Sequence, residues 1–395
     1  MAPPPLSRIL VILLVLLVSA GAGADSCTDD DGGHRSHQTR HARIFSFGDS
    51  LTDTGNALRI LGDRAIISRP PYGETFFGRP SGRASDGRIM IDFIAEAMGV
   101  PQPTPYLLAG KTAADFRRGV NFAVGGGTAL DPGFFEGRGL KIFVPVSFRN
   151  QTAWFKNALQ RLGSVHEQRN VTATSLFVVG EIGVNDYLIG LLGNRTLSEL
   201  KTVFLPRIIS AIRSAVTDVI AAGACTVVVP GAIPLGCEPE LLTLYQGRVG
   251  AGGYDPESRC ITSLNDLAEL HNRELRRMLG DLRRAHSGSG TTTTSIVYAD
   301  LYRAVTDIIV SPGRYGFRDR PLVVCCGRGG GAYNFDMAAN CGAPGTKACA
   351  DPSAYVSWDG VHFTEAANRR IACSVLGTLR LTTQAGRCRI GCDCD

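Results

Sequence analysis

Features that define several common protein classes are scarce in this chain of 395 residues. The longest apolar run, Ile9 to Val18, has ten residues, whereas a membrane-spanning helix needs about 20. Charge of one sign is scarce too, because 41 Lys and Arg residues are mixed with 36 Asp and Glu residues to give a net charge of only +5. These shortages argue against a transmembrane protein and against a nucleic-acid-binding protein.

Three chemical motifs are also absent. The sequence contains no Gly-x-Ser-x-Gly, which disfavours hydrolases that carry their serine on a nucleophile elbow. The glycine-rich stretch from Gly327 to Gly331 lacks the Lys-Ser/Thr of a phosphate-binding loop and follows Cys325-Cys326, so a disulfide-flanked loop is the better interpretation. The cysteines lack the paired Cys-x-x-Cys spacing of a zinc site. We therefore expect no metal site.

Residues 1–24 have the layout of a secretory signal peptide. Arg8 supplies the positive charge, the apolar run follows it, and Ala22-Gly23-Ala24 offers small residues for cleavage before Asp25. Residues 25–42 are polar and are predicted to form a flexible leader. The sequence thus predicts secretion, with an uncleaved anchor as the alternative.

The cysteine content agrees with secretion. Twelve cysteines in a secreted chain indicate disulfides rather than metal ligands, although their connectivity cannot be deduced. Three of them, Cys388, Cys392 and Cys394, crowd the last eight residues, which predicts that a Cys-rich tail over residues 381–395 is stapled to the body. Asn-x-Ser/Thr glycosylation acceptors, each weak evidence alone, occur at Asn150, Asn170 and Asn194.

After the leader, apolar segments alternate with amphipathic ones, which predicts a parallel sheet wrapped in helices. The strand candidates lack polar alternation, as strands buried on both faces do. No repeat and no linker is visible, so residues 43–380 are predicted to form one domain. The predicted strands are Arg43–Phe47, Gly119–Val124, Ser175–Val179, Cys225–Val229 and Ser295–Ala299. The predicted helices are Arg88–Met98, Ser147–Leu162, Leu197–Ala222, Leu264–Arg284 and one that begins near Thr364 as its N-cap.

A serine stands where the first predicted strand ends. Ser50 follows Arg43–Phe47 in a glycine-containing turn, and the carboxyl ends of strands are where open α/β sheets place their chemistry. A serine needs a base to become a nucleophile. Asp359 and His362 stand three residues apart and could supply that base and its orienting acid. The plainer interpretations are a helix cap for Ser50 and an Asp-Gly turn for Asp359.

Elimination supports His362 as the base. The chain has seven histidines, and three lie in the predicted leader. His166 adjoins a glycosylation acceptor, His271 is expected on a polar helix face, and His286 adjoins a Gly-Ser loop. Only His362 has an apolar, turn-rich setting.

Together these segments resemble the GDSL esterase/lipase family of plants, within the SGNH hydrolases. Four blocks in the same order carry the resemblance, and it extends over nearly all of the chain after residue 43. The blocks are Phe47–Asn56 with Ser50, Gly119–Gly127, Gly183–Asp186 with Asn185, and Ser357–His362.

The resemblance implies a fold and a site. The fold is a flavodoxin-like three-layer α/β/α sandwich with a central, mostly parallel, five-stranded sheet. In the family the oxyanion is held by the serine N–H, a block glycine and an asparagine side chain, which correspond here to Ser50, Gly126 and Asn185. Three consecutive glycines leave the choice of Gly126 over Gly125 uncertain by one position, and Asn185 could instead form a plain Asx turn. No metal or organic cofactor is implied.

The expected function is a secreted serine carboxylic ester hydrolase. The resemblance favours short, acetyl-type esters of cell-wall polysaccharides or small metabolites as substrates. A lipase or cutin-type acyl hydrolase, a transacylase and a non-catalytic secreted binding protein stay open as alternatives. The chain does not end in an ER-retention signal, so secretion is the default, with ER or Golgi residence left open. The oligomeric state cannot be read from the sequence.

Overall fold

The computed structural model of the chain describes residues 41–108, 112–286, 294–379 and 390–392. The predicted signal peptide, nearly all of the predicted leader and most of the predicted Cys-rich tail lie outside these residues.

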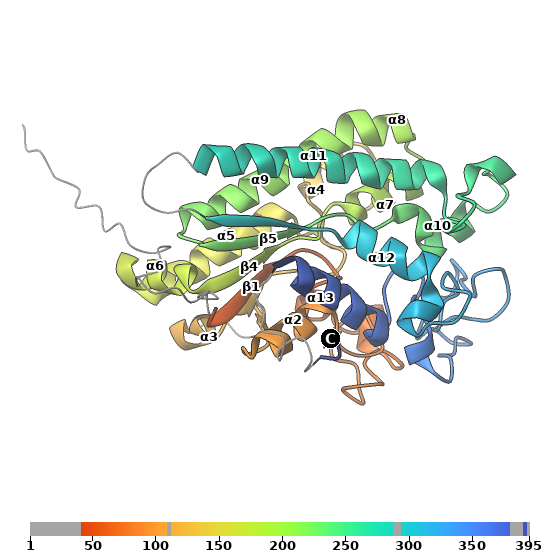
Figure 1. Cartoon of the computed structure of the whole chain (residues 1–395), viewed down its shortest axis with the longest axis horizontal. Coiled ribbons are helices and arrows are strands. Elements are labelled where there is room, and N and C mark those ends of the chain that lie inside the picture. Colours follow the sequence, from red (N-terminus) through yellow and green to blue (C-terminus); the bar gives the residue numbers. More distant parts are fainter. Residues whose placement is uncertain (1–40, 109–111, 287–293, 380–389, 393–395) are drawn as a thin grey trace, which may run out of the picture.

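A parallel sheet forms the middle layer of the molecule (Figure 1). The sequence predicted five strands, and this number is wrong because the sheet has six, in the order β2-β3-β1-β4-β5-β6. The additional strand, β2, covers only Thr104 and Pro105 at the edge of the sheet, where a proline is tolerated. The strands are β1 (Arg43–Phe47), β2 (Thr104–Pro105), β3 (Val120–Asn121), β4 (Ser175–Val179), β5 (Thr226–Pro230) and β6 (Ser295–Ala299).

The strand order reverses its direction at β1. The chain places β3 on one side of β1 and then crosses over to place β4 on the other side. Phe45 of β1 pairs with Val120 on one side and with Phe177 on the other. Such a switch point opens a crevice at the carboxyl ends of the strands, where α/β proteins bind their ligands. The fold therefore places Ser50, three residues after β1, beside this crevice.

Helices cover both faces of the sheet, as the three-layer prediction required (Figure 1). One layer contains α5, α9 and α11, and the other contains α2, α12 and α13, with contacts between neighbouring helices in each layer. The helices are α1 (Asn56–Leu61), α2 (Met90–Met98), α3 (Ala113–Arg117), α4 (Pro132–Glu136), α5 (Phe148–Leu159), α6 (Val165–Ala173), α7 (Val184–Leu192), α8 (Leu197–Glu199), α9 (Leu205–Ala221), α10 (Pro239–Leu244), α11 (Thr262–His286), α12 (Leu301–Val310) and α13 (Glu365–Leu379).

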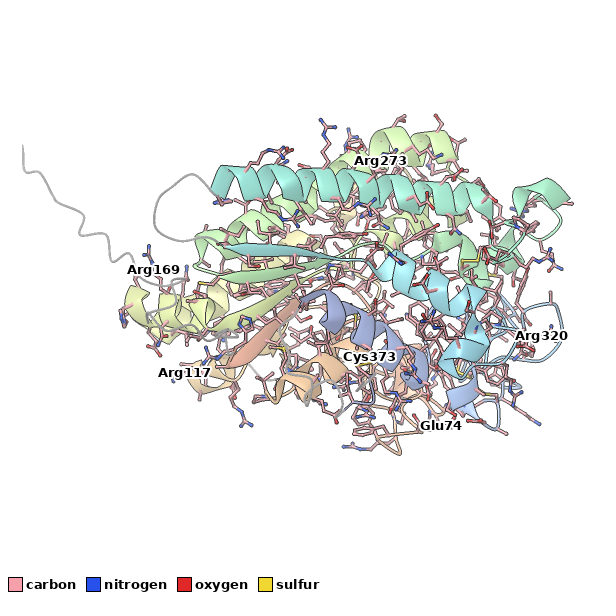
Figure 2. The ribbon with its side chains drawn as sticks, in the orientation of Figure 1. Glu74, Arg117, Arg169, Arg273, Arg320 and Cys373 are labelled. Carbon is pink, nitrogen blue, oxygen red and sulfur yellow. A yellow bond between two sulfur atoms is a disulfide. The ribbon has the colours of Figure 1, made fainter. Side chains whose placement is uncertain are left out.

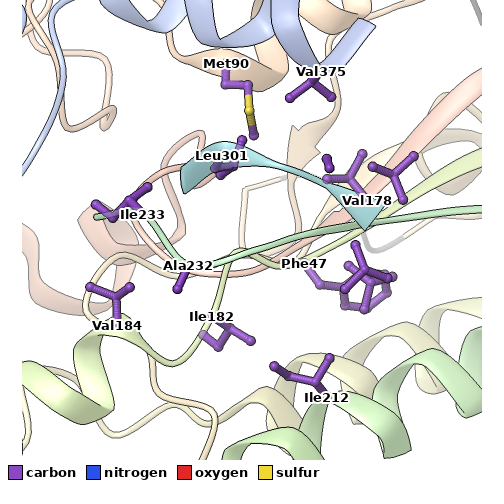
Figure 3. Packing of buried hydrophobic residues seen from close by; sticks show 14 of the residues in the cluster. Phe47, Met90, Val178, Ile182, Val184, Ile212, Ala232, Ile233, Leu301 and Val375 are labelled. Atoms are coloured by element: carbon purple, nitrogen blue, oxygen red, sulfur yellow. The ribbon is translucent and has the colours of Figure 1, made fainter. Parts of the chain in front are cut away.

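The core lies between the sheet and each helix layer (Figure 3). Met90 and Val375 pack on one side of the sheet, and Ile212 packs on the opposite side. On the α5 side, Phe45 and Phe155 meet edge to face, with ring centroids 5.9 Å apart. Strands covered on both faces bury every residue, as all five residues of β4 and of β5 are buried, and this is why their sequences lack alternation.

The predicted bounds of the longer strands agree closely with those in the structure. Three predicted strands, at Arg43, Ser175 and Ser295, match in both bounds. The predicted strand Gly119–Val124 is reduced to Val120–Asn121, although the chain stays beside β1 a little further, where Phe122 donates its N–H to the Ser46 carbonyl at 2.7 Å. The predicted helix Leu197–Ala222 is divided by a π-helical turn, η4 (Leu200–Phe204), into α8 and α9.

The predicted disulfide framework is confirmed for the part of the chain that the structure describes, where every cysteine is disulfide-bonded. Cys373 of α13 joins Cys392, so the tail is stapled to the body at this point, as expected. Two further bonds lie side by side and tie down the segment from Cys325 to Cys349. The bonds between described residues are Cys237–Cys260, Cys325–Cys349, Cys326–Cys341 and Cys373–Cys392.

Charged side chains are distributed around the periphery (Figure 2). The labelled arginines Arg117, Arg169, Arg273 and Arg320 come from different segments of the chain, in agreement with the mixed charge of the sequence. Among the described residues, no helix combines the length and the apolar character needed to cross a membrane. In the same residues, no cluster of three or more side chains has the composition of a metal site.

Candidate active site

The turn that carries Ser50 is fixed by hydrogen bonds to a buried glutamine, Gln151. Gly48 donates its N–H to Gln151 Oε1 at 2.9 Å and accepts a hydrogen bond from Gln151 Nε2 at 2.8 Å. A side chain at Gly48 has no room, because its Cβ would stand 2.7 Å from the Glu181 carbonyl oxygen and φ is +147°. The close approach of β1 and the loop after β4 thus requires glycine at this turn.

Ser50, His362 and Asp359 form one continuous hydrogen-bonded chain. His362 Nε2 lies 2.8 Å from Ser50 Oγ, and His362 Nδ1 lies 2.7 Å from Asp359 Oδ2. Residues 312 positions apart in the sequence therefore come within hydrogen-bond reach. The loop before α13 preassembles the acid and the base, because Asp359 Oδ1 also accepts the backbone N–H of His362 at 2.8 Å. This geometry is that of a nucleophile, a base and an orienting acid.

The surroundings of the triad set the pKa values of Asp359 and His362. Burial alone would raise the pKa of Asp359, but the neighbouring His362 and the hydrogen bonds from His362 and Tyr72 bring that pKa down to about 2. Burial lowers the pKa of His362, yet the carboxylates of Asp359, Asp49 and Glu240 outweigh it and hold that pKa above 6.5. The pair is thus an ionised acid beside a readily protonated imidazole.

Two backbone N–H groups beside Ser50 are without partners in the described parts of the chain. These are the N–H groups of Ser50 and of Gly126. Gly125, in contrast, donates its N–H to Asp53 Oδ2 at 2.8 Å. Gly125 and Gly126 both line the cavity next to the serine, so only Gly126 of the two has an N–H free to bind an anion there.

Asn185 lies on the same cavity, in the first turn of α7. The helix begins after Gly183, whose φ of +115° suits glycine. The amide Nδ2 of Asn185 donates to Asp49 Oδ2 at 3.1 Å and to the Gly127 carbonyl at 3.0 Å. These two bonds hold the amide between the serine turn and the glycine loop.

Two buried carboxyl groups, those of Asp49 and Glu181, lie next to the serine turn. Glu181 is 1% exposed, and burial together with the Asp49 carboxyl raises the pKa of Glu181 well above its ordinary value. Burial also raises the pKa of Asp49, to about 6. The Asp49 carboxylate faces Asn185 and His362.

A cavity of about 260 Å³ opens at the triad. Most of its lining is apolar, and among the described residues the only ionisable acid or base that it adds to the triad, apart from the Tyr72 phenol, is Glu240, at the start of α10. Burial and the nearby Asp359 raise the pKa of Glu240 to about 7. Ile66 and Phe143 line the cavity and are 37% and 42% exposed, so the rim is apolar as well. The cavity thus suits an uncharged group beside the reacting ester.

Two predictions about histidines need correction. His271 was expected on a polar helix face, but it is only 1% exposed, because α11 presents it to α7, where its Nδ1 lies 3.0 Å from the Tyr187 hydroxyl. Burial lowers the pKa of His271 to about 4. His41, assigned to the flexible leader, is 5% exposed, and the next residue, Ala42, donates its N–H to the Thr174 carbonyl at 2.9 Å. The ordered body thus begins before β1.

The three asparagines predicted to be glycosylation acceptors lie on the surface. Asn150, Asn170 and Asn194 are all exposed. Asn150 also takes part in the cap of α5, where its Oδ1 accepts the Ser147 N–H at 2.9 Å.

Sequence reasoning missed several residues that build this site. Gln151 was assigned to a helix with no role, Asp53 lies in the serine block but was not considered, and Tyr72 donates a hydrogen bond to Asp359 at 2.7 Å. The sequence signals for a role of these residues were weak. Asp53 was marked only by its position in the serine block, and Tyr72 was marked only by its position in a turn after Pro70-Pro71.

Comparison with known proteins agrees with this fold. Residues 44–375 match the model of the GDSL-like lipase/acylhydrolase family. A GDSL esterase/lipase of Arabidopsis thaliana is 42% identical over 337 residues, which cover 84% of this chain and 83% of the relative. Two others from the same plant are 40% identical over 377 residues (94% and 88% covered) and 43% identical over 332 residues (83% and 82% covered).

The chain belongs to the GDSL-like lipase/acylhydrolase family, since the match spans most of its length. It is accordingly a carboxylic ester hydrolase.

Proposed function

We propose that the chain hydrolyses esters through an acyl-enzyme formed on Ser50. His362 takes the proton from Ser50 Oγ as the oxygen attacks the ester carbonyl carbon, and Asp359 orients and stabilises the resulting imidazolium. His362 then returns the proton to the departing alcohol. Water repeats the sequence on the acyl-enzyme and releases the acid. The observation that carries this proposal is the unbroken chain Ser50–His362–Asp359, with contacts of 2.8 and 2.7 Å.

The oxyanion of the tetrahedral intermediate is bound by the N–H groups of Ser50 and Gly126 and by the Asn185 amide. Donors fixed before the reaction stabilise developing charge without reorganisation. Because the Asn185 amide already donates to Asp49 and Gly127, one of its N–H groups is shared with the oxyanion during the reaction. This role accounts for the two unpartnered backbone N–H groups at the cavity.

For the substrate, we propose short acyl esters of cell-wall polysaccharides or of small metabolites. The open mouth of the cavity leaves room for a large alcohol portion. A second candidate, an acyl hydrolase for longer chains, is favoured by one observation: the apolar lining continues to the exposed rim residues Ile66 and Phe143.

We further propose that the enzyme is secreted as one hydrolase domain over residues 43–380. Cleavage before Asp25 removes the signal peptide, and sugars are attached at Asn150, Asn170 and Asn194. Disulfide pairing of every described cysteine supports an oxidising compartment. Peptide mapping of the protein secreted by a plant host, with and without glycosidase, tests the cleavage point and the three sites.

The activity is tested with p-nitrophenyl acetate and p-nitrophenyl palmitate. Ser50→Ala serves as the blank, and Ser210→Ala, an exposed serine of α9, serves as the matched control. Fast release of p-nitrophenol from acetate that depends on Ser50 supports the short-chain proposal. Preference for palmitate replaces it with the long-chain candidate. Equal activity of Ser50→Ala and the native enzyme contradicts the mechanism.

A further inference from the structure

A buried tyrosine adds a fourth member to the hydrogen-bonded chain. Tyr72 is 0% exposed and lies between η2 (Ile66–Ser68) and α2, in a segment without regular structure. Its hydroxyl donates to Asp359 Oδ2 at 2.7 Å. The same oxygen accepts the hydrogen bond from His362 Nδ1, also at 2.7 Å. One carboxylate oxygen therefore stands between a phenol and the imidazole.

We propose that Tyr72 is a positioning residue of this esterase: its hydroxyl holds the Asp359 carboxylate in the orientation that the His362 ring requires and limits how strongly that carboxylate attracts a proton onto the ring. The inference rests on the proposed roles of Ser50, His362 and Asp359. Tyr72 acts through Asp359 and needs no contact with the reacting ester.

The hydrogen bonds of Asp359 show why the hydroxyl is needed. Oδ1 is held by the backbone N–H groups of Val361 and His362, at 3.0 and 2.8 Å. Without Tyr72, Oδ2 would keep only the bond to the His362 ring, which itself has to move a proton during each turnover. Asp359 is only 6% exposed, so solvent has little access to replace this hydroxyl. Among the described residues, the tyrosine thus supplies the one hydrogen bond to Oδ2 that is independent of the base.

The tyrosine is fixed in place by its surroundings. Its ring meets the buried Trp358 ring edge to face, with centroids 6.0 Å apart. Asp359 is ionised, with a pKa of about 2, whereas burial and this carboxylate raise the pKa of Tyr72 well above 10. The phenol is consequently the donor and the carboxylate the acceptor at every pH at which the enzyme works.

These charges determine whether loss of the Tyr72 hydroxyl raises or lowers the pKa of His362. A donor on Oδ2 withdraws negative charge from the oxygen that faces His362, so removing it strengthens the pull of Asp359 on the imidazolium and raises the pKa of His362 further. The other groups that face His362 are Asp49 and Glu240, and those that face Asp359 include Glu238 and Glu240. All of them are acidic and unchanged by a substitution at Tyr72.

The test is Tyr72→Phe, which removes one oxygen atom and leaves the ring. Hydrogen bonds to charged groups are worth enough to change a rate by tenfold or more, so we expect kcat to fall about tenfold while KM stays within about twofold. The acid limb of the kcat/KM profile should move to higher pH. Tyr302→Phe is the matched control, because it removes a hydroxyl bonded to Glu269 at 2.8 Å, away from the triad; its kcat and pH limb should not change.

A double-mutant cycle separates positioning from a general packing role. In an Asp359→Asn background, adding Tyr72→Phe should change kcat by less than about twofold, because the residue through which Tyr72 acts has been altered. An equal loss in both backgrounds overturns the proposal, and so does a folded Tyr72→Phe enzyme with native kcat and native pH limb. Loss of Ser50 dependence would instead overturn the proposed function itself.

A second substitution keeps the proposal testable if Tyr72→Phe does not fold. Replacing Tyr72 alone with 3-fluorotyrosine preserves the ring and the hydroxyl but makes the hydroxyl a stronger donor. The acid limb should then move in the opposite direction, to lower pH. An unchanged limb in the folded fluorinated enzyme contradicts the proposal.

Discussion

Asp53 accepts the backbone N–H of Gly125 at 2.8 Å and so removes it from the cavity beside Ser50. The same carboxylate accepts the N–H groups of Gly55, Asn56 and Ala57 at the start of α1. One buried side chain thus fixes the turn after the serine and the glycine loop relative to each other. Among the described residues the next N–H, that of Gly126, has no partner, which is why we propose Gly126 rather than Gly125 as an oxyanion donor.

Asn185→Ala tests the proposed oxyanion site. The substitution removes a hydrogen-bond donor that is already in position before the reaction. In other enzymes, loss of one oxyanion-hole donor lowers kcat by about 10²–10³-fold. We expect a loss in this range with little change in KM, measured on p-nitrophenyl acetate. Gln168→Ala, an amide on the surface helix α6, is the control and should keep native kcat. A native kcat for Asn185→Ala would remove this residue from the mechanism.

The pH dependence of kcat/KM tests His362. The base must be neutral to accept a proton, and its pKa is held above 6.5 by Asp359, Asp49 and Glu240. Activity should therefore fall with decreasing pH along a limb whose midpoint lies above 6.5. In Glu240→Gln one of the three raising carboxylates is neutralised, so the midpoint should move to lower pH. Two results would contradict this account of the His362 pKa. One is a midpoint below pH 6 for the acid limb of the native enzyme, and the other is a midpoint that moves to higher pH in Glu240→Gln.

Arg83 and Asp92 form a buried ion pair that should matter for stability. Arg83 Nε and Nη2 bind the two Asp92 oxygens at 2.7 and 2.8 Å, and the side chains are 9% and 0% exposed. Arg83→Met leaves a buried carboxylate without its partner, which typically destabilises a protein by about 3–5 kcal/mol. The free energy of unfolding in urea should drop by this amount, and the pair substitution Arg83→Met with Asp92→Leu should recover most of it.

The control for this prediction is the exposed pair Arg149–Asp131, whose side chains are 84% and 48% exposed. Arg149→Ala should change the free energy of unfolding by less than about 1 kcal/mol. Equal losses at the two arginines would mean that burial of the first pair does not determine its contribution.

The disulfide Cys326–Cys341 should support both stability and activity. Its cysteines are 15 residues apart, and closing a loop of this length is worth about 3 kcal/mol in the chain-entropy account. The backbone N–H of Cys326 also donates to the Trp358 carbonyl at 2.7 Å, next to Asp359. Replacing both cysteines by serine should lower the unfolding temperature and reduce kcat. The same replacement at Cys373–Cys392 should lower the unfolding temperature alone, and a reversed pattern would contradict the coupling.

The sequence predicted most accurately what rests on local patterns. The continuous apolar run Ser175–Val179 was predicted with its bounds, because burial on both faces leaves a strong signal. Thr364 was predicted to cap the last helix, and its Oγ1 accepts the Ala367 N–H at 3.2 Å. The class of fold and the family were predicted from the four sequence blocks, which stand in this chain in the same order as in the family.

What the sequence could not provide are contacts between distant segments. Tyr72 and Asp359 are 287 positions apart, and no pattern near either residue indicates their hydrogen bond. His271 looked exposed because polar residues surround it in the sequence, whereas the packing of α11 against α7 buries it. β2 pairs through only two residues, one of them proline, and leaves no periodic signal.

Labelling with a serine-reactive phosphonate tests the central claim most directly. The reagent forms a covalent bond only with an activated serine, and peptide mass spectrometry identifies the residue. We predict a single adduct on Ser50, loss of ester hydrolysis in proportion to labelling, and no adduct on Ser50→Ala or on the native enzyme well below pH 6. An adduct on another serine, or undiminished hydrolysis by a fully labelled enzyme, would contradict the account.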